Sequence, residues 1–187
     1  MEIHDILKLL NACKEAQEWA SDKTWEQIYN ECHRGDWLCW LFARTNINDI
    51  QLLTLVKGHQ ANTVRHLMKD ERSLNAVDSA IAFGEGKISI EELNRVANDS
   101  YDVPCTKYAD VAAAAAATTT YSFFYDFTIC FTPRLYTHYN ADNTTAAAFY
   151  SAEAAFYING RADSIKNKQD TADIFRQFIS IDKFNLC

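Results

Sequence analysis

The sequence predicts an all-α protein, and three observations lead to that class. Its 187 residues include only five glycines and two prolines, too few for the many tight turns of a β-sandwich or barrel. Apolar residues recur at three- and four-residue spacing along most of the chain, as on one face of a helix. Capping boxes at Thr24–Gln27 and Ser89–Glu92 mark helix starts. We expect a single compact domain over 1–187, of about seven to nine packed helices.

The first hundred residues contain most of the helix signals. Residues 3–20 have helical spacing and predict one helix or a pair. The first capping box predicts a helix from Trp25 to about His33. Asn46–Asp49 offers caps for a helix from Ile50 to about Lys69, which Gly58 weakens in its middle.

The next segment ends in a glycine pair. Leu74, Val77 and Ile81 have helical spacing, and the glycines of Phe83–Gly86 supply a left-handed stop. The second capping box starts another helix. Pro104 disfavours a helical conformation at Val103, which predicts a hinge near 98–105.

Two alanine-rich segments, Ala109–Ala117 and Ala141–Ala162, follow. Small faces let helices approach closely, so we expect two tightly packed helices with aromatic flanks. Sequence alone leaves open whether residues 109–160 pack within one chain or across an interface. Tyr121–Phe131 has strand propensity, but its spacing favours a helix. Asp170–Phe178 predicts a last amphipathic helix behind an Asp cap.

The stretch Arg34-Gly35-Asp36 predicts a corner between two helices, because glycine ends helices and aspartate starts them. The following run, Trp37–Ala43, is apolar on every face, which predicts a buried helix. We therefore assign structural roles to Gly35, Asp36, Trp37 and Trp40. Burial of Trp37 disfavours an exposed recognition loop.

No catalytic or metal-binding signature stands out. Six cysteines form no Cys-x-x-Cys pair, and five histidines are scattered without a zinc-hydrolase spacing. We expect no enzymatic activity, no metal and no cofactor. A small enzyme with a Cys/His site stays an open alternative, because such partners meet only in space.

Charge constrains the partner. The net charge is −7, and residues 1–100 contain 16 acidic against 11 basic residues. An acidic field disfavours nucleic acid and anionic membranes, and it steers a basic protein inward. Negative charge that only aids solubility is the plainer alternative. No strongly apolar window of about 20 residues predicts a membrane span, and an N-terminus without a basic signal region predicts a cytoplasmic protein.

The order of these features resembles the immunity proteins of bacterial polymorphic toxin systems. The similarity lies in Ala12–Trp19, in Thr24-Trp25-Glu26, and in Cys32–Leu41. It continues through Phe83–Gly86, Ser89, Glu92-Leu93 and the alanine-rich segments. Arg-Gly-Asp-Trp-Leu-x-Trp-Leu is its most specific element. The resemblance implies a helical cytoplasmic protein that binds and neutralises a cognate toxin.

We therefore expect a protein that occludes a basic toxin domain through an acidic surface. The alternative is a non-catalytic scaffold that forms a homodimer or larger assembly. Its alanine and aromatic faces would then continue across the interface between copies. Arg34 is the member of its triplet that we expect to reach a partner. The full set of expected contact residues is Glu15, Glu18, Glu26, Glu31, Arg34, Asp70, Glu71, Glu91 and Glu92.

Overall fold

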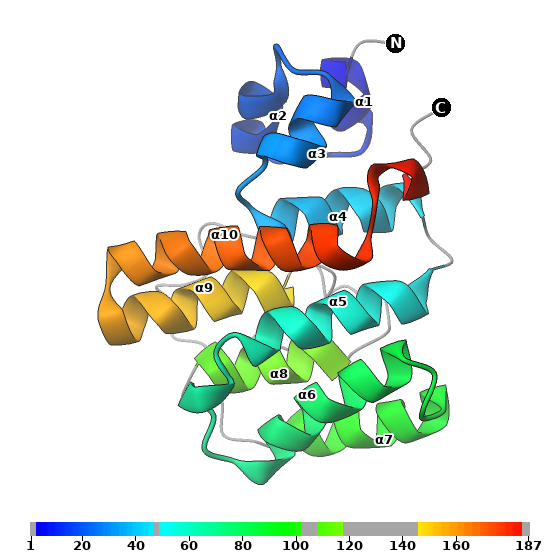
Figure 1. Ribbon diagram of the computed structural model, residues 1–187, viewed down its shortest axis with the longest axis vertical. Helices are drawn as coiled ribbons and strands as arrows, with labels where there is room; N and C mark the ends of the chain where they lie inside the picture. Colours follow the sequence, from blue (N-terminus) through cyan, green and yellow to red (C-terminus); the bar gives the residue numbers. More distant parts are fainter. Residues whose placement is uncertain (1–2, 47–48, 102–107, 118–145, 185–187) are drawn as a thin grey trace.

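The computed structural model describes residues 3–46, 49–101, 108–117 and 146–184, and all regular structure within these ranges is helical (Figure 1). Ten α-helices and two short 3-10 helices occur there, slightly more than the seven to nine expected. The all-α prediction is confirmed.

Three short helices form a unit at one end of the molecule: α1 (Ile3–Leu9), α2 (Lys14–Ala20) and α3 (Trp25–Glu31) (Figure 1). Residues 3–20 are thus a helix pair, separated near Asn11, whose φ is +61°. The capping box of α3 is confirmed. The Gln27 N–H donates to the Thr24 hydroxyl at 3.2 Å, and the Thr24 N–H donates to the Gln27 side chain at 2.8 Å.

Helices α4 (Gly35–Thr45) and α5 (Ile50–Asn62) follow. The prediction that α5 continues to about Lys69 was wrong, because the chain tightens into the 3-10 helix η1 (Arg65–Leu67). Gly58 has a packing role within α5. A Cβ there would lie 2.8 Å from Cγ1 of Ile81, so glycine lets α5 and α6 (Glu71–Gly84) approach closely.

Helix α7 (Ile90–Tyr101) starts where predicted, with the Glu92 N–H donating to the Ser89 hydroxyl at 3.3 Å. Gly86 has a φ of +73°, which confirms the left-handed stop after α6. Gly84 lies within α6, against Leu55 of α5. The hinge predicted near 98–105 was wrong for 98–101, which form the last turn of α7, and 102–105 lie outside the described residues.

Helices α8 (Tyr108–Ala117) and α9 (Ala146–Asn159) contain the alanine runs and pack against each other, as predicted. Tyr121–Phe131 lies outside the described residues. The last long helix, α10 (Arg161–Phe178), starts nine residues earlier than expected. Asp170 is therefore not a cap. It lies inside α10 and pairs with Lys166 at 2.6 Å. A 3-10 turn, η3 (Ile181–Lys183), follows.

Two clusters of buried apolar residues share the interior. The aromatic core joins α1–α4 to α10 and the C-terminal turn, and contains Leu38, Phe42, Phe175, Ile179 and Phe184. The alanine core joins α5–α9. Its buried alanines include Ala61, Ala80, Ala112, Ala113, Ala116, Ala147 and Ala154.

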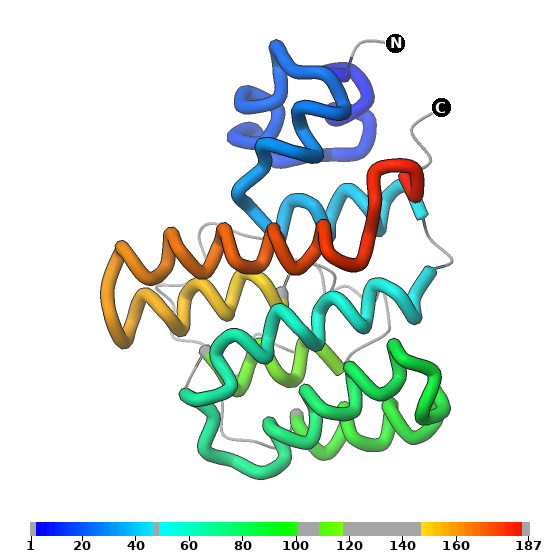
Figure 2. Tube along the Cα trace, in the orientation of Figure 1, coloured from blue at the N-terminus to red at the C-terminus, as the bar shows by residue number. Residues whose placement is uncertain are grey.

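Helix α5 lies between α10 and α6, so it borders both cores (Figure 2). Its buried Gln60 links the surrounding helices. The Gln60 amide donates to the Thr171 carbonyl at 3.0 Å, and Ser151 donates to the Gln60 carbonyl at 3.1 Å. Buried Lys57 of α5 donates to the Ala115 carbonyl near the end of α8, where a cation complements the helix dipole. This polar contact zone satisfies buried groups that would otherwise destabilise the fold.

Candidate protein-binding surface

The eight acids expected to form one surface lie in three places. Glu15 and Glu18 are on α2, and Glu26 and Glu31 are on α3. The other four lie at the starts of α6 and α7, which occupy the opposite end of the molecule from α1–α3 (Figure 1). They are Asp70, Glu71, Glu91 and Glu92. The structure therefore does not bring the eight acids together.

Two of the four distant acids have local structural roles. Asp70 caps α6 by accepting from the Arg72 N–H at 2.9 Å, and it also pairs with the Arg72 guanidinium at 2.8 Å. These hydrogen bonds lower the pKa of Asp70 to about 2. A hydrogen bond from Ser89 lowers the pKa of Glu91. The acids of α2 and α3 are exposed, as are Glu71, Glu91 and Glu92. Glu18 and Glu31 also form ion pairs, with Lys14 at 3.4 Å and Lys23 at 2.8 Å. The acids of α2 and α3 are the better candidates because all four lie on one three-helix unit.

Arg34 does not extend outward, and its burial corrects the expectation that it reaches a partner. Its side chain is 7% exposed and bonds the Asp36 carboxylate with two donors, at 2.8 and 2.6 Å. Its guanidinium also lies 4.6 Å from the centre of the Trp37 ring. The Arg34–Asp36 ion pair therefore stabilises the start of α4.

Gly35 and Asp36 lie at the predicted corner between α3 and α4, but the prediction that Gly35 ends the preceding helix was wrong, because α3 ends at Glu31 and Gly35 is the first residue of α4. Arg34, not Asp36, is the N-cap residue of α4, and buried Asp36 lies in its first turn. A Cβ on Gly35 would lie 2.6 Å from the carbonyl carbon of Thr171, so α4 meets α10 where only glycine fits. The prediction that α4 is buried all round was wrong for Trp37 and Trp40, which are half-buried.

The three-helix unit joins the body at a contact that we call the seam, formed by Glu15, Trp19, Arg34 and Trp37. The rings of Trp19 and Trp37 pack with centroids 6.0 Å apart, and Glu15 lies 3.9 Å from the Arg34 guanidinium. Lys23 lies over the Trp19 ring, 5.1 Å from its centre. Each indole of the seam therefore has a cation over its ring, an arrangement that stabilises the contact.

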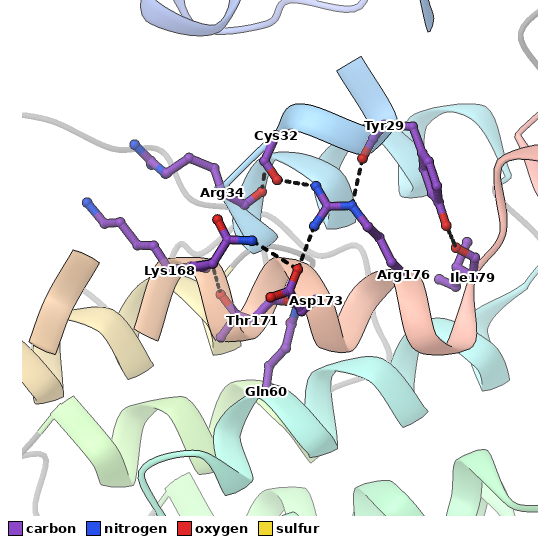
Figure 3. A network of polar contacts seen from close by, with 10 residues as sticks. Tyr29, Cys32, Arg34, Gln60, Lys168, Thr171, Asp173, Arg176 and Ile179 are labelled. Carbon is purple, nitrogen blue, oxygen red and sulfur yellow. Dashed lines mark hydrogen bonds and ion pairs between the residues drawn. The ribbon is translucent and has the colours of Figure 1, made fainter. Parts of the chain in front are cut away.

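A second contact holds the unit against α10 (Figure 3). Arg176 donates to the Tyr29 carbonyl at 2.8 Å and to the Cys32 carbonyl, and it pairs with Asp173 at 3.0 Å. These carbonyls lie at the end of α3, where the helix dipole favours a cation. The Tyr29 hydroxyl donates to the Ile179 carbonyl at 2.9 Å. We call Arg176 with Tyr29 and Cys32 the Arg176 clamp.

The side chains of Arg34 and Lys168 point in the same direction (Figure 3). Both attract the carboxylate of Glu153 on α9, but burial has the larger effect and raises the pKa of Glu153. Glu153 is half-buried. It is a carboxylate that an additional cation would stabilise.

An exposed apolar cluster lies near the turn between α9 and α10. Phe156, Tyr157, Ile158 and Ile165 are 45%, 61%, 62% and 55% exposed, and we call them the α9–α10 tip. The turn contains Gly160, with φ +90°, and projects from the side of the body (Figure 1). Elsewhere in the described residues, only Leu9 and Ile90 are large, apolar and comparably exposed.

Sequence reasoning missed this tip because it treated both aromatic pairs of the alanine helix alike. Phe149 and Tyr150 are half-buried, as flanks of the helix pair should be. Phe156 and Tyr157 lie two turns later, where the neighbouring first turn of α10 supplies only Arg161, Ala162 and Asp163. The Asn159-Gly160 helix stop directly after three large apolar residues was the available signal.

The cysteine and histidine side chains bear on the alternative of a catalytic or metal-binding site. Burial raises the pKa of Cys32 to about 11, which disfavours the thiolate that a nucleophile needs. Cys39 is fully buried. His59 stacks on Phe178 at 4.7 Å, and burial lowers its pKa. Within the described ranges, no three His, Cys, Asp or Glu side chains are grouped to hold a metal ion.

Two further findings concern membranes and relatives. In the described part of the chain, no helix combines the length and apolar character needed to cross a bilayer. Comparison with protein-family models, with curated proteins and with solved structures found no match for this chain.

Proposed function

We propose that this protein binds a bacterial toxin domain in the cytoplasm and neutralises it by occlusion, without chemistry of its own. The observation that carries the proposal is the acidic three-helix unit. Residues 3–31 contain six acidic and three basic residues and form a separate unit at one end of the body (Figure 1). Such a unit attracts a basic protein and leaves its outer face accessible for contact.

The resemblance of Cys32–Leu41 to immunity proteins supports the same proposal from the sequence. The triplet in this motif is buried and fixes the start of α4, while the exposed acids lie on the neighbouring α2 and α3. In this proposal, the motif positions the three-helix unit, and the unit's outer surface contacts the toxin.

Co-expression tests the function directly. A toxin domain encoded beside this gene is induced in bacteria with and without the full chain, and growth is recorded. We expect the chain to restore growth and to co-purify with the toxin. Absence of rescue and of any complex, with every toxin encoded nearby, would refute the proposal.

Charge-matched variants test the role of the three-helix unit. Replacing Glu15, Glu18 and Glu26 by Gln should slow association with the toxin on the order of tenfold at low ionic strength, because long-range attraction is lost. Replacing Glu71, Glu91 and Glu92 removes the same charge from the other end and should leave the rate within about twofold. Equal slowing by both triple variants, measured by stopped-flow fluorescence, would show that net charge alone matters.

A further inference from the structure

A short segment of chain, residues 32–34, joins the three-helix unit to the body. The backbones of Cys32 and Arg34 are extended there, between the end of α3 and the start of α4. Helices α1, α2 and α3 have seven residues each, too few to be stable without packing against other parts of the chain. The position of the unit therefore depends on contacts with segments that are distant in sequence.

The C-terminal end of the chain supplies several of these contacts. The Tyr29 hydroxyl donates to the Ile179 carbonyl at 2.9 Å (Figure 3), and the Tyr29 ring meets Phe184 edge to face at 6.1 Å. Phe184 in turn packs against two other rings of the aromatic core, at 5.5 and 5.9 Å. The turn 179–184 thus connects α3 to the body. We call this turn together with the Arg176 clamp the C-terminal latch.

The seam contains a polar group whose burial opposes the closed position of the unit. Among the described residues, the indole N–H of Trp37 is buried and has no hydrogen-bond acceptor. An unsatisfied buried donor costs free energy, and opening of the seam would let water accept this hydrogen bond. The cost weakens the seam, so the closed position depends more strongly on the C-terminal latch.

We propose that the C-terminal latch holds the three-helix unit in the orientation that binds the toxin, and that release of the latch opens the unit about residues 32–34. The inference rests on the proposed function and adds to it the element that positions the binding surface. Arg176 and the C-terminal turn are then positioning residues. They act by raising the fraction of molecules whose unit is closed and competent to bind.

Two buried cysteines distinguish opening of the unit from unfolding of the whole chain. Cys32 is 2% exposed and lies in the segment that joins the unit to the body, whereas Cys39 is fully buried within α4, 3.4 Å from the Gln60 side chain. Local opening exposes Cys32 alone, and global unfolding exposes both thiols. N-ethylmaleimide labelling of the full chain, read by mass spectrometry after trypsin digestion, separates them, because cleavage after Arg34 places them on different peptides.

Releasing the latch should accelerate labelling of Cys32 in the free chain. Tyr29→Ala with Arg176→Met removes the ring contact with Phe184 and the charged donor to two carbonyls. Each loss should contribute about tenfold, so Cys32 should be labelled about 100-fold faster while Cys39 stays protected. Tyr29→Phe keeps the ring and loses only the hydroxyl, so its effect should stay below about tenfold.

A matched double variant controls for the loss of the same side chains elsewhere. Tyr150→Ala with Arg95→Met removes a half-buried tyrosine from α9 and an exposed arginine from α7. Labelling of Cys32 should change by less than about threefold in this control, because neither residue belongs to the latch. Equal acceleration in both double variants, acceleration of Cys39 together with Cys32, or unchanged Cys32 labelling in the latch variant would overturn the latch.

Toxin binding should reverse the opening. Calorimetry gives the Kd of the latch variant for the toxin domain encoded beside this gene. At a free toxin concentration of about 100 times that Kd, Cys32 labelling should slow about 100-fold, because a ligand that binds only the closed form depopulates the open form. A complex in which Cys32 is labelled as fast as in the free variant would overturn the positioning role. Absence of any complex with the unmodified chain would refute the proposed function, while labelling of the free chain still decides the latch.

Discussion

In the aromatic core, Phe42, Phe175 and Phe184 meet at centroid distances of 5.5 to 6.0 Å, whereas the alanine core brings α8 against α9 over methyl groups. Large rings fill the space between helices whose backbones stay apart, while small side chains let backbones come close. The two cores should therefore be destabilised by opposite changes in side-chain volume. The aromatic core should be sensitive to lost volume, and the alanine core to added volume.

The difference extends to how each region is held together. Helix α5 contacts α6, α8 and α9 extensively, and α8 in turn contacts both α6 and α9. The three-helix unit instead meets the body through the aromatic core, the seam and the Arg176 clamp. Its helices are short and have few backbone approaches to the body helices, so loss of a single clamp residue should loosen the unit locally.

The largest expected effect is loss of volume from the aromatic core. Phe42→Ala should lower the free energy of unfolding by about 3–5 kcal/mol, because Phe42 is fully buried and contacts two other rings. Urea denaturation followed by circular dichroism measures the change. Leu9→Ala is the control, since Leu9 is 69% exposed and its loss should cost less than about 0.5 kcal/mol.

Loss of the Arg176 clamp should come next, and its effect should be local. Arg176→Met leaves the Tyr29 and Cys32 carbonyls without their charged donor, at a cost of about 2–3 kcal/mol. Hydrogen exchange should accelerate in residues 14–33 and stay unchanged in 71–101. Arg95→Met, which removes an exposed cation from α7, is the matched control. Uniform acceleration along the chain by Arg176→Met would contradict a separately held unit.

Added volume in the alanine core should cost about 1–3 kcal/mol. Ala113→Leu inserts three carbon atoms where no side chain surface is exposed, so α8 must shift or strain. Ala162→Leu at the exposed start of α10 adds the same atoms in solvent and should be nearly neutral. Thermal unfolding of both variants provides the comparison. A stabilised Ala113→Leu would show that the alanine core contains unfilled space.

The smallest expected effect appears at alkaline pH. The pKa of Cys32 is about 11 in the folded chain against an ordinary value of 9.0. A raised folded pKa stabilises the protein below pH 9, and this contribution disappears as the pH rises through 11. At pH 10 about 1 kcal/mol should be lost. Cys32→Ala should therefore lose less stability than the unmodified chain between pH 8 and pH 10 in urea titrations.

Interactions between residues that are close in sequence made much of this fold predictable. Most of the features that were predicted wrongly depend on contacts between segments that are distant in sequence. The Thr24 capping box and the left-handed Gly86 involve neighbouring residues, so their sequence signals were sufficient. Gly58 looked like a weakness because its contact, Ile81, lies in another helix. Likewise, Arg34 looked exposed because nothing in the sequence shows that Asp36 and Trp37 enclose it.

The candidate surface was less predictable than the fold for the same reason. Acidic residues can be counted along a sequence, but their separation onto opposite ends of the molecule depends on topology (Figure 1). Tyr157 and Ile158 are exposed because they lie in the last turn of α9, and the sequence does not show which helices pack beside that turn. A sequence that marks these residues as apolar predicts burial by default, so an exposed apolar tip is recognised only in the structure.

Hydrogen exchange of the full chain, free and in complex with the toxin domain encoded beside its gene, tests the central claim most directly. The account predicts slower exchange on binding in residues 14–31, with α6 and α7 unchanged. Protection confined to α6 and α7, or a complex that leaves residues 14–31 unprotected, would contradict it.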